Sequence, residues 1–326
     1  MTTPIFRAPS SPAASPAHAY GVLRHGFASF YAAPVVEDMD DWRADVAFVG
    51  VPFDAGTNDR PGARFGPAAI RDASMRYRPE ELWSGWIDAE QGTRVLDGVS
   101  MADVGDVNVR TVDLLENFDA ITEAARMARR GSRVPVFIGG DHAITFPLVR
   151  AFDDTPLTLV QFDAHQDYTD EKAGVRYSHD NHMRRSSELP HVERIANIGL
   201  RGVIEHFEPY DAALRDGVAI VPAERIVREG VDAALASITG GGPAYVTIDI
   251  DVLDPSGAPG TGYPEPGGIT YYHLRDALRI VAARYDVIAF DVCEVDPIYD
   301  TAGVTTRIAA KLVLDFLAAI FSKQTA

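Results

Sequence analysis

The sequence predicts an α/β fold, namely a single-domain three-layer α/β/α sandwich around a mainly parallel sheet of about eight strands. From Val46 onward, short β-rich runs alternate with longer segments of helical spacing, as in chains built from α/β units. No Pro- or Ser-rich linker interrupts this alternation, which favours one domain. Several of the apolar runs end in carboxylates and imidazoles, as expected where strand ends form a binding crevice.

The predicted strands are short runs rich in β-branched and aromatic residues, such as "DVAFVGVPF", "LTLVQFD" and "AYVTIDI". Their length, and their separation by helical segments, indicate strands that are buried within one parallel sheet. In chain order, strands are expected at 45–53, 100–105, 134–140, 157–163, 194–201, 218–222, 244–250 and 286–295.

The predicted helices are the segments in which apolar residues recur every three or four positions. The clearest case contains Leu114, Leu115, Phe118, Ile121 and Ala125, which we interpret as a core-facing stripe. The "GGG" at 240–242 terminates a preceding helix. Helices are expected at 66–75, 114–130, 143–152, 223–238, 271–284 and 303–322.

The composition limits the classes of function. The chain has 326 residues, 46% of them apolar, and a formal net charge of −17. This charge argues against binding to nucleic acid or to an anionic membrane surface and is compatible with a cationic substrate. The only cysteine, Cys293, lies within an apolar strand, so no internal disulfide can form and the thiol is interpreted as a buried spectator.

Residues 1–40 are predicted to form a Pro- and Ala-rich N-terminal extension that precedes a catalytic domain at 41–326. The extension lacks the continuous apolar core of a signal peptide, and no later stretch reaches the length of a membrane span. We therefore predict a soluble cytoplasmic protein. The Pro-rich leader is expected either to be disordered or to lie across a neighbouring surface, and the second arrangement implies subunit contacts.

Three acidic motifs follow predicted strands: "GGDH" at 139–142, "DAHQD" at 163–167 and "DIDVLDP" at 249–255. Three strand ends of this kind would bring several uncompensated charges together, and bound cations remove that problem. Carboxylate oxygen with some imidazole nitrogen and no thiolate suits a hard or borderline divalent ion such as manganese. The number of acidic residues indicates two ions, which can activate a water molecule as a nucleophile near neutral pH.

Together with "SH" at 178–179, "PEPGG" at 264–268 and "EVDP" at 294–297, these motifs resemble the ureohydrolase family, which includes arginases and agmatinases. The segment "GVPFDAGTNDRPGARFGPAAIR" at 50–71 is similar to the agmatinase branch. The resemblance runs from about Val46 to the C-terminus with the motifs in the family's order. It implies an arginase-like α/β/α sandwich with a binuclear manganese centre that hydrolyses a guanidinium group to an amine and urea.

The resemblance also implies roles for individual residues. One ion would be held by His142, Asp163, Asp167 and Asp249, and the other by Asp163, His165, Asp249 and Asp251, with Asp163 and Asp249 as bridges. His179 is the candidate proton shuttle for the departing amine, and Glu294 occupies the guanidinium-binding position.

Two departures from the family pattern lie where the substrate is expected. This chain has "SHDNHMRR" where agmatinase-like members usually read "SHGTPFRR", so Asp180, Asn181 and His182 are unusual. It also has Tyr263 where the family commonly has Thr, and a tyrosine should narrow or redirect the pocket. Asp180, Asn181, Tyr263 and Glu294 are therefore the predicted substrate contacts, and His182 competes with His179 for the shuttle role.

The preferred function is a manganese-dependent amidinohydrolase with agmatine as the first substrate candidate. Asp170 and Glu171 can receive a distal ammonium group, whereas Lys172 and Arg176 in the same loop can bind a carboxylate. Guanidinobutyrate-type acids and other guanidines therefore remain alternatives, and nickel or cobalt can replace manganese on the same ligands. Family resemblance further suggests a homotrimer or homohexamer.

Two other classes of function are compatible with parts of the sequence. A different two-metal hydrolase, such as a phosphoesterase, can use the same metal chemistry, but no arginine cluster accompanies the motifs to hold a phosphate. A catalytically silent member of the family is the third alternative, and it is ranked last because the metal ligands, the shuttle and the glutamate are all present.

Overall fold

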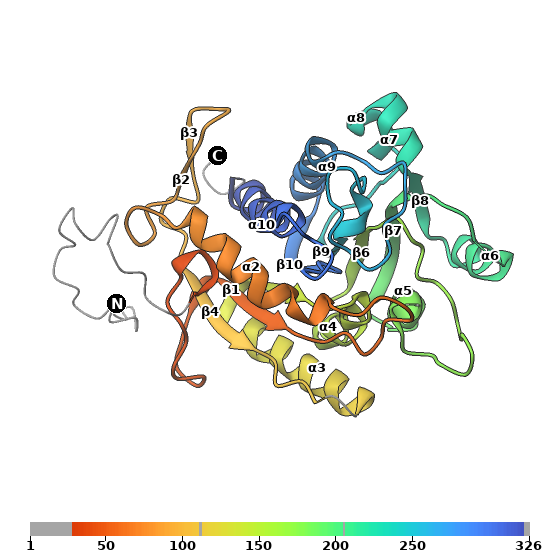
Figure 1. The fold of residues 1–326 in the computed structure, drawn as a ribbon, viewed down its shortest axis with the longest axis horizontal. Coiled ribbons are helices and arrows are strands. Elements are labelled where there is room, and N and C mark those ends of the chain that lie inside the picture. Colours follow the sequence, from red (N-terminus) through yellow and green to blue (C-terminus); the bar gives the residue numbers. More distant parts are fainter. Residues whose placement is uncertain (1–27, 111–112, 205, 323–326) are drawn as a thin grey trace.

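The computed structural model describes residues 28–110, 113–204 and 206–322. Its centre is an eight-stranded sheet in which all neighbouring strands are parallel (Figure 1). This sheet confirms the predicted fold class. In spatial order it consists of β4 (Met101–Asp106), β1 (Ala44–Val51), β5 (Ser132–Gly139), β10 (Asp286–Cys293), β9 (Pro243–Asp249), β6 (Leu157–Phe162), β7 (Val192–Leu200) and β8 (Ala219–Pro222).

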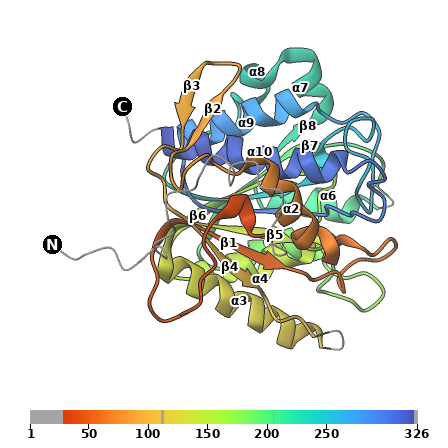
Figure 2. The ribbon, with the colours of Figure 1, turned by 60° about the vertical axis from the view of Figure 1, so that its left-hand side comes forward.

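Helices cover both faces of the sheet and give three layers (Figure 2). One layer contains α2 (Gly66–Ser74), α7 (Ala223–Glu229), α8 (Val231–Leu235), α9 (Tyr271–Arg284) and α10 (Val304–Ser322). The other contains α3 (Leu114–Gly131), α4 (Thr145–Val149), α5 (His182–Ser187) and α6 (Phe207–Arg215). Short 3-10 turns are η1 (Phe30–Ala32), η2 (Ala63–Phe65), η3 (Met75–Tyr77), η4 (His142–Ile144), η5 (Arg150–Phe152), η6 (His179–Asn181) and η7 (Ile250–Val252).

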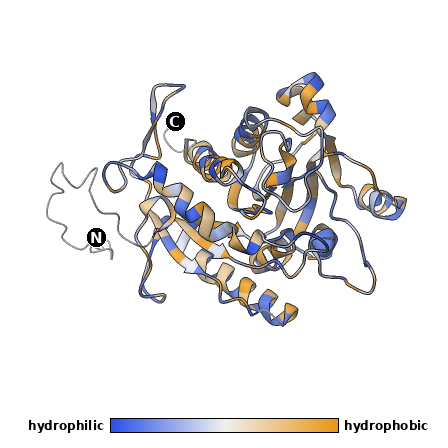
Figure 3. Ribbon diagram, viewed as in Figure 1, coloured by the Kyte–Doolittle hydropathy of each residue, from blue (hydrophilic) through white to orange (hydrophobic). Residues whose placement is uncertain are grey.

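Alternate residues of each central strand belong to different cores, because successive side chains of a strand point to opposite faces. Val136 and Ile138 of β5 pack into the core beneath α2, α9 and α10, whereas Phe137 packs into the core beneath α3 and α4. The central strands therefore contribute apolar side chains to both cores, and the hydropathy colouring shows that hydrophobic residues are frequent along them (Figure 3).

The structure differs from the sequence prediction in several elements outside the main sheet. The single helix expected at 223–238 is two helices, because Gly230 adopts a left-handed conformation at φ 84° between them. The segment expected as one helix at 143–152 is α4 flanked by the turns η4 and η5. Three further elements were not predicted: α5, α6 and the hairpin of β2 (Trp86–Asp88) and β3 (Thr93–Val95). Each of the two hairpin strands is too short to show a repeating pattern.

The last part of the predicted N-terminal extension packs on the chain's own domain, while residues 1–27 lie outside the described residues. Phe30 and Tyr31 are buried, and the Tyr31 hydroxyl donates a hydrogen bond to the carbonyl of Ala310 in α10 at 2.7 Å. Val35 pairs with Asp103 at the edge of the sheet. Within the described part of the chain, no helix has both the length and the apolar character needed to cross a membrane.

Candidate metal centre

The four central strands of the sheet carry the predicted site residues at their carboxyl ends. These strands, β5, β10, β9 and β6, are consecutive in space, and the chain leaves them toward His142, Glu294, Asp249 and Asp163 respectively. The register sets their ends level, because Val292 pairs with both Ile138 and Ile248, and Phe162 also pairs with Ile248. Strand ends in parallel sheets form the usual binding crevice of such folds.

His142 lies at the centre of the first group of ligand atoms. Its Nδ1 atom is 3.0 Å from Asp163 Oδ2, 3.1 Å from Asp249 Oδ2 and 3.4 Å from Asp167 Oδ2. Ligand atoms placed about 2.1 Å from one ion and at right angles to each other are roughly 3 Å apart. The separations around His142 therefore have the size expected for atoms that share one ion.

A second group lies beside the first and shares Asp163 with it. His165 Nδ1 is 3.0 Å from Asp251 Oδ2 and 3.5 Å from Asp163 Oδ1, while the other oxygen of Asp163 faces His142. Asp163 thus lies between the two groups, in the bridging place. Asp249 places Oδ2 3.1 Å from His142 Nδ1, and its Oδ1 accepts a hydrogen bond from the backbone N–H of Asp251 at 2.8 Å.

Local turns hold these side chains in place. Asp163 and Asp249 each accept a hydrogen bond from the backbone N–H two residues later, at His165 and Asp251, so that the chain turns as soon as the strand ends. Asp167 and Glu294 have left-handed backbone conformations at φ 50° and 60°. Such conformations are costly for residues with a side chain, and they are concentrated at functional sites.

Burial sets the electrostatics of the cluster. Burial, together with the neighbouring carboxylates, holds the pKa values of Asp167 and Asp249 well above the usual range. The pKa of Asp163 is well below its usual value, because hydrogen bonds to His142 and His165 outweigh the effect of burial. Burial also disfavours charged imidazoles, yet the nearby carboxylates raise the pKa values of His142 and His165.

The donor set fits two divalent cations. With neutral imidazoles, the four carboxylates of Asp163, Asp167, Asp249 and Asp251 would carry four negative charges, which two divalent ions would balance. The donors are oxygen with a minority of nitrogen, as hard and borderline ions prefer. Among the groups of mutually close ligand atoms in the described residues, one contains His142, Asp163 and Asp167, and another contains Asp163, His165 and Asp251.

A buried polar network behind the cluster orients His142. The Nε2 atom of His142 is 2.7 Å from the Thr247 hydroxyl, which donates a hydrogen bond to Asp291 at 2.6 Å. Asp291 also accepts hydrogen bonds from the Tyr245 hydroxyl and the Cys293 thiol, and burial raises its pKa. Partners of this kind fix the ring orientation of a ligating histidine. Thr247 and Asp291 were not predicted as site residues from the sequence, although both are polar residues inside apolar strands.

A cavity of about 670 Å³ opens above the cluster, and His179, Glu294, Asp180 and Tyr263 form part of its wall. His179 Nδ1 is 3.3 Å from Glu294 Oε1, and His179 Nε2 is 3.2 Å from Asp180 Oδ1. Burial alone would lower the pKa of His179, but its hydrogen bond to Glu294 and the nearby carboxylates raise it. A protonated imidazole beside the cluster is what a proton donor requires.

The remaining predicted substrate residues differ in position. Tyr263 is 36% exposed and presents its ring edge-on to His179, with 5.3 Å between the ring centroids. Asn181 is fully buried and does not line the cavity. Its Oδ1 accepts hydrogen bonds from the backbone and hydroxyl of Ser178, and its Nδ2 donates to the carbonyl of Thr169. The expected substrate contact of Asn181 is therefore not supported, since the turn of η6 directs this amide into the protein.

Two further residues shape the cavity and were not singled out from the sequence. The backbone nitrogen of Asn58 lies 3.4 Å from His179 Nε2, and its side-chain amide donates a hydrogen bond to Asp180 Oδ2 at 2.6 Å. Arg201 lines the cavity and donates to the carbonyls of Asp251 at 2.6 Å and Glu265 at 2.7 Å. Asn58 belongs to the family-like segment at 50–71, which was the available signal, whereas nothing in the sequence around Arg201 indicated its role.

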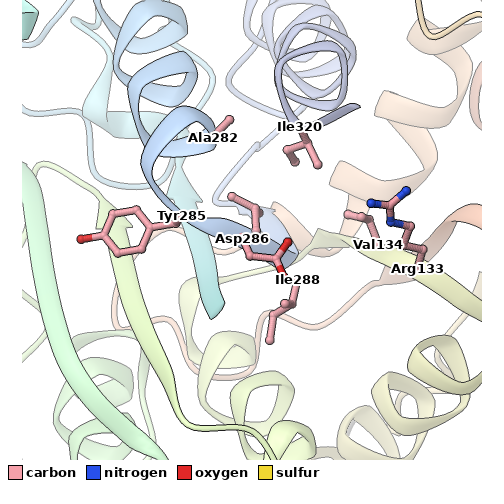
Figure 4. A pocket seen from close by; sticks show the side chains of 8 residues that line it. Arg133, Val134, Ala282, Tyr285, Asp286, Ile288 and Ile320 are labelled. Carbon is pink, nitrogen blue, oxygen red and sulfur yellow. The ribbon is translucent and has the colours of Figure 1, made fainter. Parts of the chain in front are cut away.

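A second cavity, of about 280 Å³, lies at the opposite end of the sheet, where β5 and β10 begin (Figure 4). Arg133, Tyr285 and Asp286 are its polar lining residues, and none of the residues that line it is a histidine or a cysteine. This cavity therefore offers no comparable metal chemistry.

Comparison with known proteins agrees with this geometry. The model of the arginase family matches residues 44–319. Chicken mitochondrial agmatinase is 37% identical over 84% of this chain and 80% of its own, and guanidinobutyrase from Pseudomonas aeruginosa is 36% identical over 90% and 92%. A solved structure of a hypothetical agmatinase from Burkholderia thailandensis superposes with a TM-score of 0.80 at 31% identity and covers 93% of each chain. Proclavaminate amidinohydrolase from Streptomyces clavuligerus superposes with a TM-score of 0.79 at 32% identity, over 91% of this chain and 97% of that one.

Proposed function

The chain belongs to the arginase family, and on that premise we propose that it is a two-metal amidinohydrolase that cleaves a guanidino compound to an amine and urea. One observation carries the proposal: the histidine and aspartate cluster lies at the base of a cavity whose wall contains His179 and Glu294. The six ligands we assign are His142, Asp163, His165, Asp167, Asp249 and Asp251. Two manganese ions held there would lower the pKa of a bound water and so supply the nucleophile.

Glu294 and His179 would act on the substrate directly. The Glu294 carboxylate can accept paired hydrogen bonds from a planar guanidinium group and so orient its carbon toward the cluster. Oε1 of Glu294 accepts the backbone N–H of His142 at 2.8 Å, which fixes the carboxylate relative to the metal ligands. His179 would donate a proton to the departing nitrogen, which cannot leave as an amide anion.

The charges around the cavity favour a cationic substrate tail, and agmatine is our first candidate. The rim carries the carboxylates of Glu171, Asp180, Glu208 and Glu265. Lys172 lies 3.0 Å from Asp180, and Arg201 is engaged with backbone carbonyls, so both cations of the rim already have anionic or polar partners. A rim of this kind attracts an ammonium group more than a carboxylate.

Guanidino acids are the second candidate class. Relatives named agmatinase and guanidinobutyrase are almost equally similar to this chain, at 37% and 36% identity. Lys172 could bind a substrate carboxylate if it exchanged its contact with Asp180 for the substrate. An agmatine site and a guanidinobutyrate site therefore differ here mainly in which partner Lys172 takes.

The test begins with removal of metal by a chelator, followed by separate reloading with manganese, nickel or cobalt. Urea release is then measured from agmatine, guanidinobutyrate, guanidinopropionate, arginine and guanidine. The proposal expects urea from at least one compound, with loss of activity on stripping and in His142→Ala, and retention in His206→Ala as a control from the same cavity wall. Metal-loaded protein that releases no urea from any of the five would contradict it.

We also propose a cytoplasmic homotrimer or homohexamer, on the strength of the family resemblance. Light scattering on the metal-loaded protein measures the oligomeric state, and a monomeric mass would contradict this part of the proposal. Fractionation of cells that produce the protein tests its location.

A further inference from the structure

His182 is a buried imidazole beside the first group of ligands. It begins α5, is only 1% exposed, and its Nε2 atom lies 2.9 Å from Asp167 Oδ2. Asp167 Oδ2 is also the oxygen that faces His142. Ligand atoms of His142, Asp163, Asp167 and His182 all lie within 4.8 Å of one another. This position belongs to a segment in which the chain departs from its family's usual sequence.

The ring of His182 has few polar contacts. It stacks on the ring of His142 with a centroid distance of 3.9 Å and an interplanar angle of 27°. Its Nδ1 atom is buried and has no hydrogen-bond partner among the described residues, so Nε2 is its only polar contact. Buried polar groups are normally satisfied, and a buried imidazole with a single polar contact that faces a metal cluster requires an explanation.

We propose that His182 is an additional ligand, through Nε2, of the ion that His142, Asp163, Asp167 and Asp249 would hold. The 2.9 Å separation from Asp167 Oδ2 has the same size as the separations around His142, which are those of atoms that share one ion. This inference rests on the proposed metal centre and adds a seventh ligand to it.

The consequence is a first site that is richer in nitrogen than the second. With His182, the first ion has two imidazole ligands, whereas the second has only His165. Imidazole suits nickel and other borderline ions, and carboxylate suits manganese. His182 should therefore shift the preference of the first site from manganese toward nickel or cobalt.

The first experiment counts imidazoles in the unmodified protein. The protein is loaded with nickel, its metal content is measured, and X-ray absorption fine structure then gives the number of imidazoles per bound nickel. We expect two ions and three imidazoles, from His142, His165 and His182. Two ions with only two imidazoles would overturn the inference and leave His182 as a hydrogen-bond donor to Asp167.

The second experiment uses His182→Phe, which keeps a ring that can stack on His142 but removes Nε2. Nickel affinity should fall by about 10- to 100-fold, manganese affinity should fall less, and the imidazole count should drop from three to two. His191→Phe is the matched control, because His191 is also buried and its ring nitrogen contacts only the carbonyl of Val149 at 3.0 Å. Equal losses of nickel and manganese affinity in His182→Phe would contradict the inference.

Metal content, imidazole count and urea release together distinguish an error in the role of His182 from an error in the proposed function. Protein that binds two ions with one imidazole each and still releases urea would refute the role of His182 alone. Protein that binds none of the three metals would refute both. If His182→Phe fails to fold, the imidazole count of the unmodified protein still decides.

Discussion

Nδ1 of His179 lies 3.3 Å from Oε1 of Glu294, and that same oxygen accepts the backbone N–H of His142 at 2.8 Å. A single carboxylate oxygen therefore connects the candidate proton donor to the turn that carries the candidate metal ligand His142. Since Glu294 has a left-handed backbone at φ 60°, this connection depends on a conformation that the surrounding structure must maintain.

Replacement of His179 by Asn should lower kcat by about 100- to 10,000-fold, because the leaving nitrogen loses its proton donor. Metal content should not change, since neither nitrogen of His179 belongs to the ligand groups. Steady-state urea release and metal analysis measure the two effects. His206→Asn, in the wall of the same cavity, should retain activity. A variant at position 179 with kcat within threefold of the unmodified protein would rule out the shuttle role.

The pH profile of activity should have two limbs. Ligating imidazoles must be neutral, so activity rises from acid pH, and His179 must be protonated, so activity falls as the pH passes its raised pKa. Asp180 is one of the charges that raise the pKa of His179, so Asp180→Asn should move the alkaline limb to lower pH. Glu208→Gln is the control on the same rim and should leave the limb in place. If the alkaline limb stays at the same pH in Asp180→Asn, the limb does not arise from deprotonation of His179.

Tyr263→Thr should change the choice of substrate. The ring of Tyr263 lies beside the rings of His179 and His165, and a substrate cation placed over it would lose about 0.5–1.5 kcal/mol of cation–π attraction. The KM of the best substrate should rise by roughly 2- to 12-fold. Compounds with bulkier tails should gain in kcat/KM relative to it. Tyr272→Thr, on the exposed side of α9, serves as the control. Identical substrate rankings before and after the change at 263 would show that this ring does not shape the pocket.

Asp296 should make the protein less stable as the pH rises. It is fully buried, and burial together with the charges of Glu294 and Asp54 raises its pKa to about 6. The folded state therefore binds this proton more tightly than the unfolded chain does, and the free energy of unfolding falls between about pH 4 and pH 6. Asp296→Asn removes this dependence, so the variant should gain about 1–2 kcal/mol relative to the unmodified protein between pH 4.5 and pH 7.5.

Urea unfolding of both metal-free proteins at the two pH values measures that gain. The metal-ligand groups titrate in both proteins and cancel in the difference. Asp286→Asn provides a control, since Asp286 is an exposed carboxylate at the opposite end of the sheet. A gain that does not depend on pH would mean that Asp296 is ionised in the folded protein at both values.

The central part of the fold was predictable because a parallel strand that is buried on both faces requires a short continuous apolar run, which can be recognised in the sequence. All eight strands of the main sheet coincide with apolar runs. The candidate ligands stand at the carboxyl ends of β5, β6 and β9 or within three residues of them, so the topology alone brings His142, Asp163 and Asp249 together. Beyond the strand ends, the apolar runs no longer predict which way a side chain points. In the turn η6, one residue separates Asp180, which lines the cavity, from His182, which stacks on His142, and Asn181 between them faces the protein interior.

That difference has a physical cause. Side-chain directions in a 3-10 turn depend on where the turn begins and on which backbone groups it satisfies, and here Ser178 and Asn181 decide both. The pattern of polar and apolar residues does not indicate where such a turn begins or which backbone groups it satisfies. The same holds for Gly230, where one left-handed residue divides a continuous helical pattern into α7 and α8.

At the rim of the cavity, Arg201 donates its side-chain hydrogen bonds to main-chain oxygens. Its guanidinium donates to the carbonyls of Gly199, Asp251, Val252, Leu253, Glu265 and Pro266. Hydrogen bonds to backbone carbonyls do not depend on the side chains that those residues carry. One residue thus holds two loops together, and the frame around Asp251 does not depend on which side chain stands at a rim position such as Glu265.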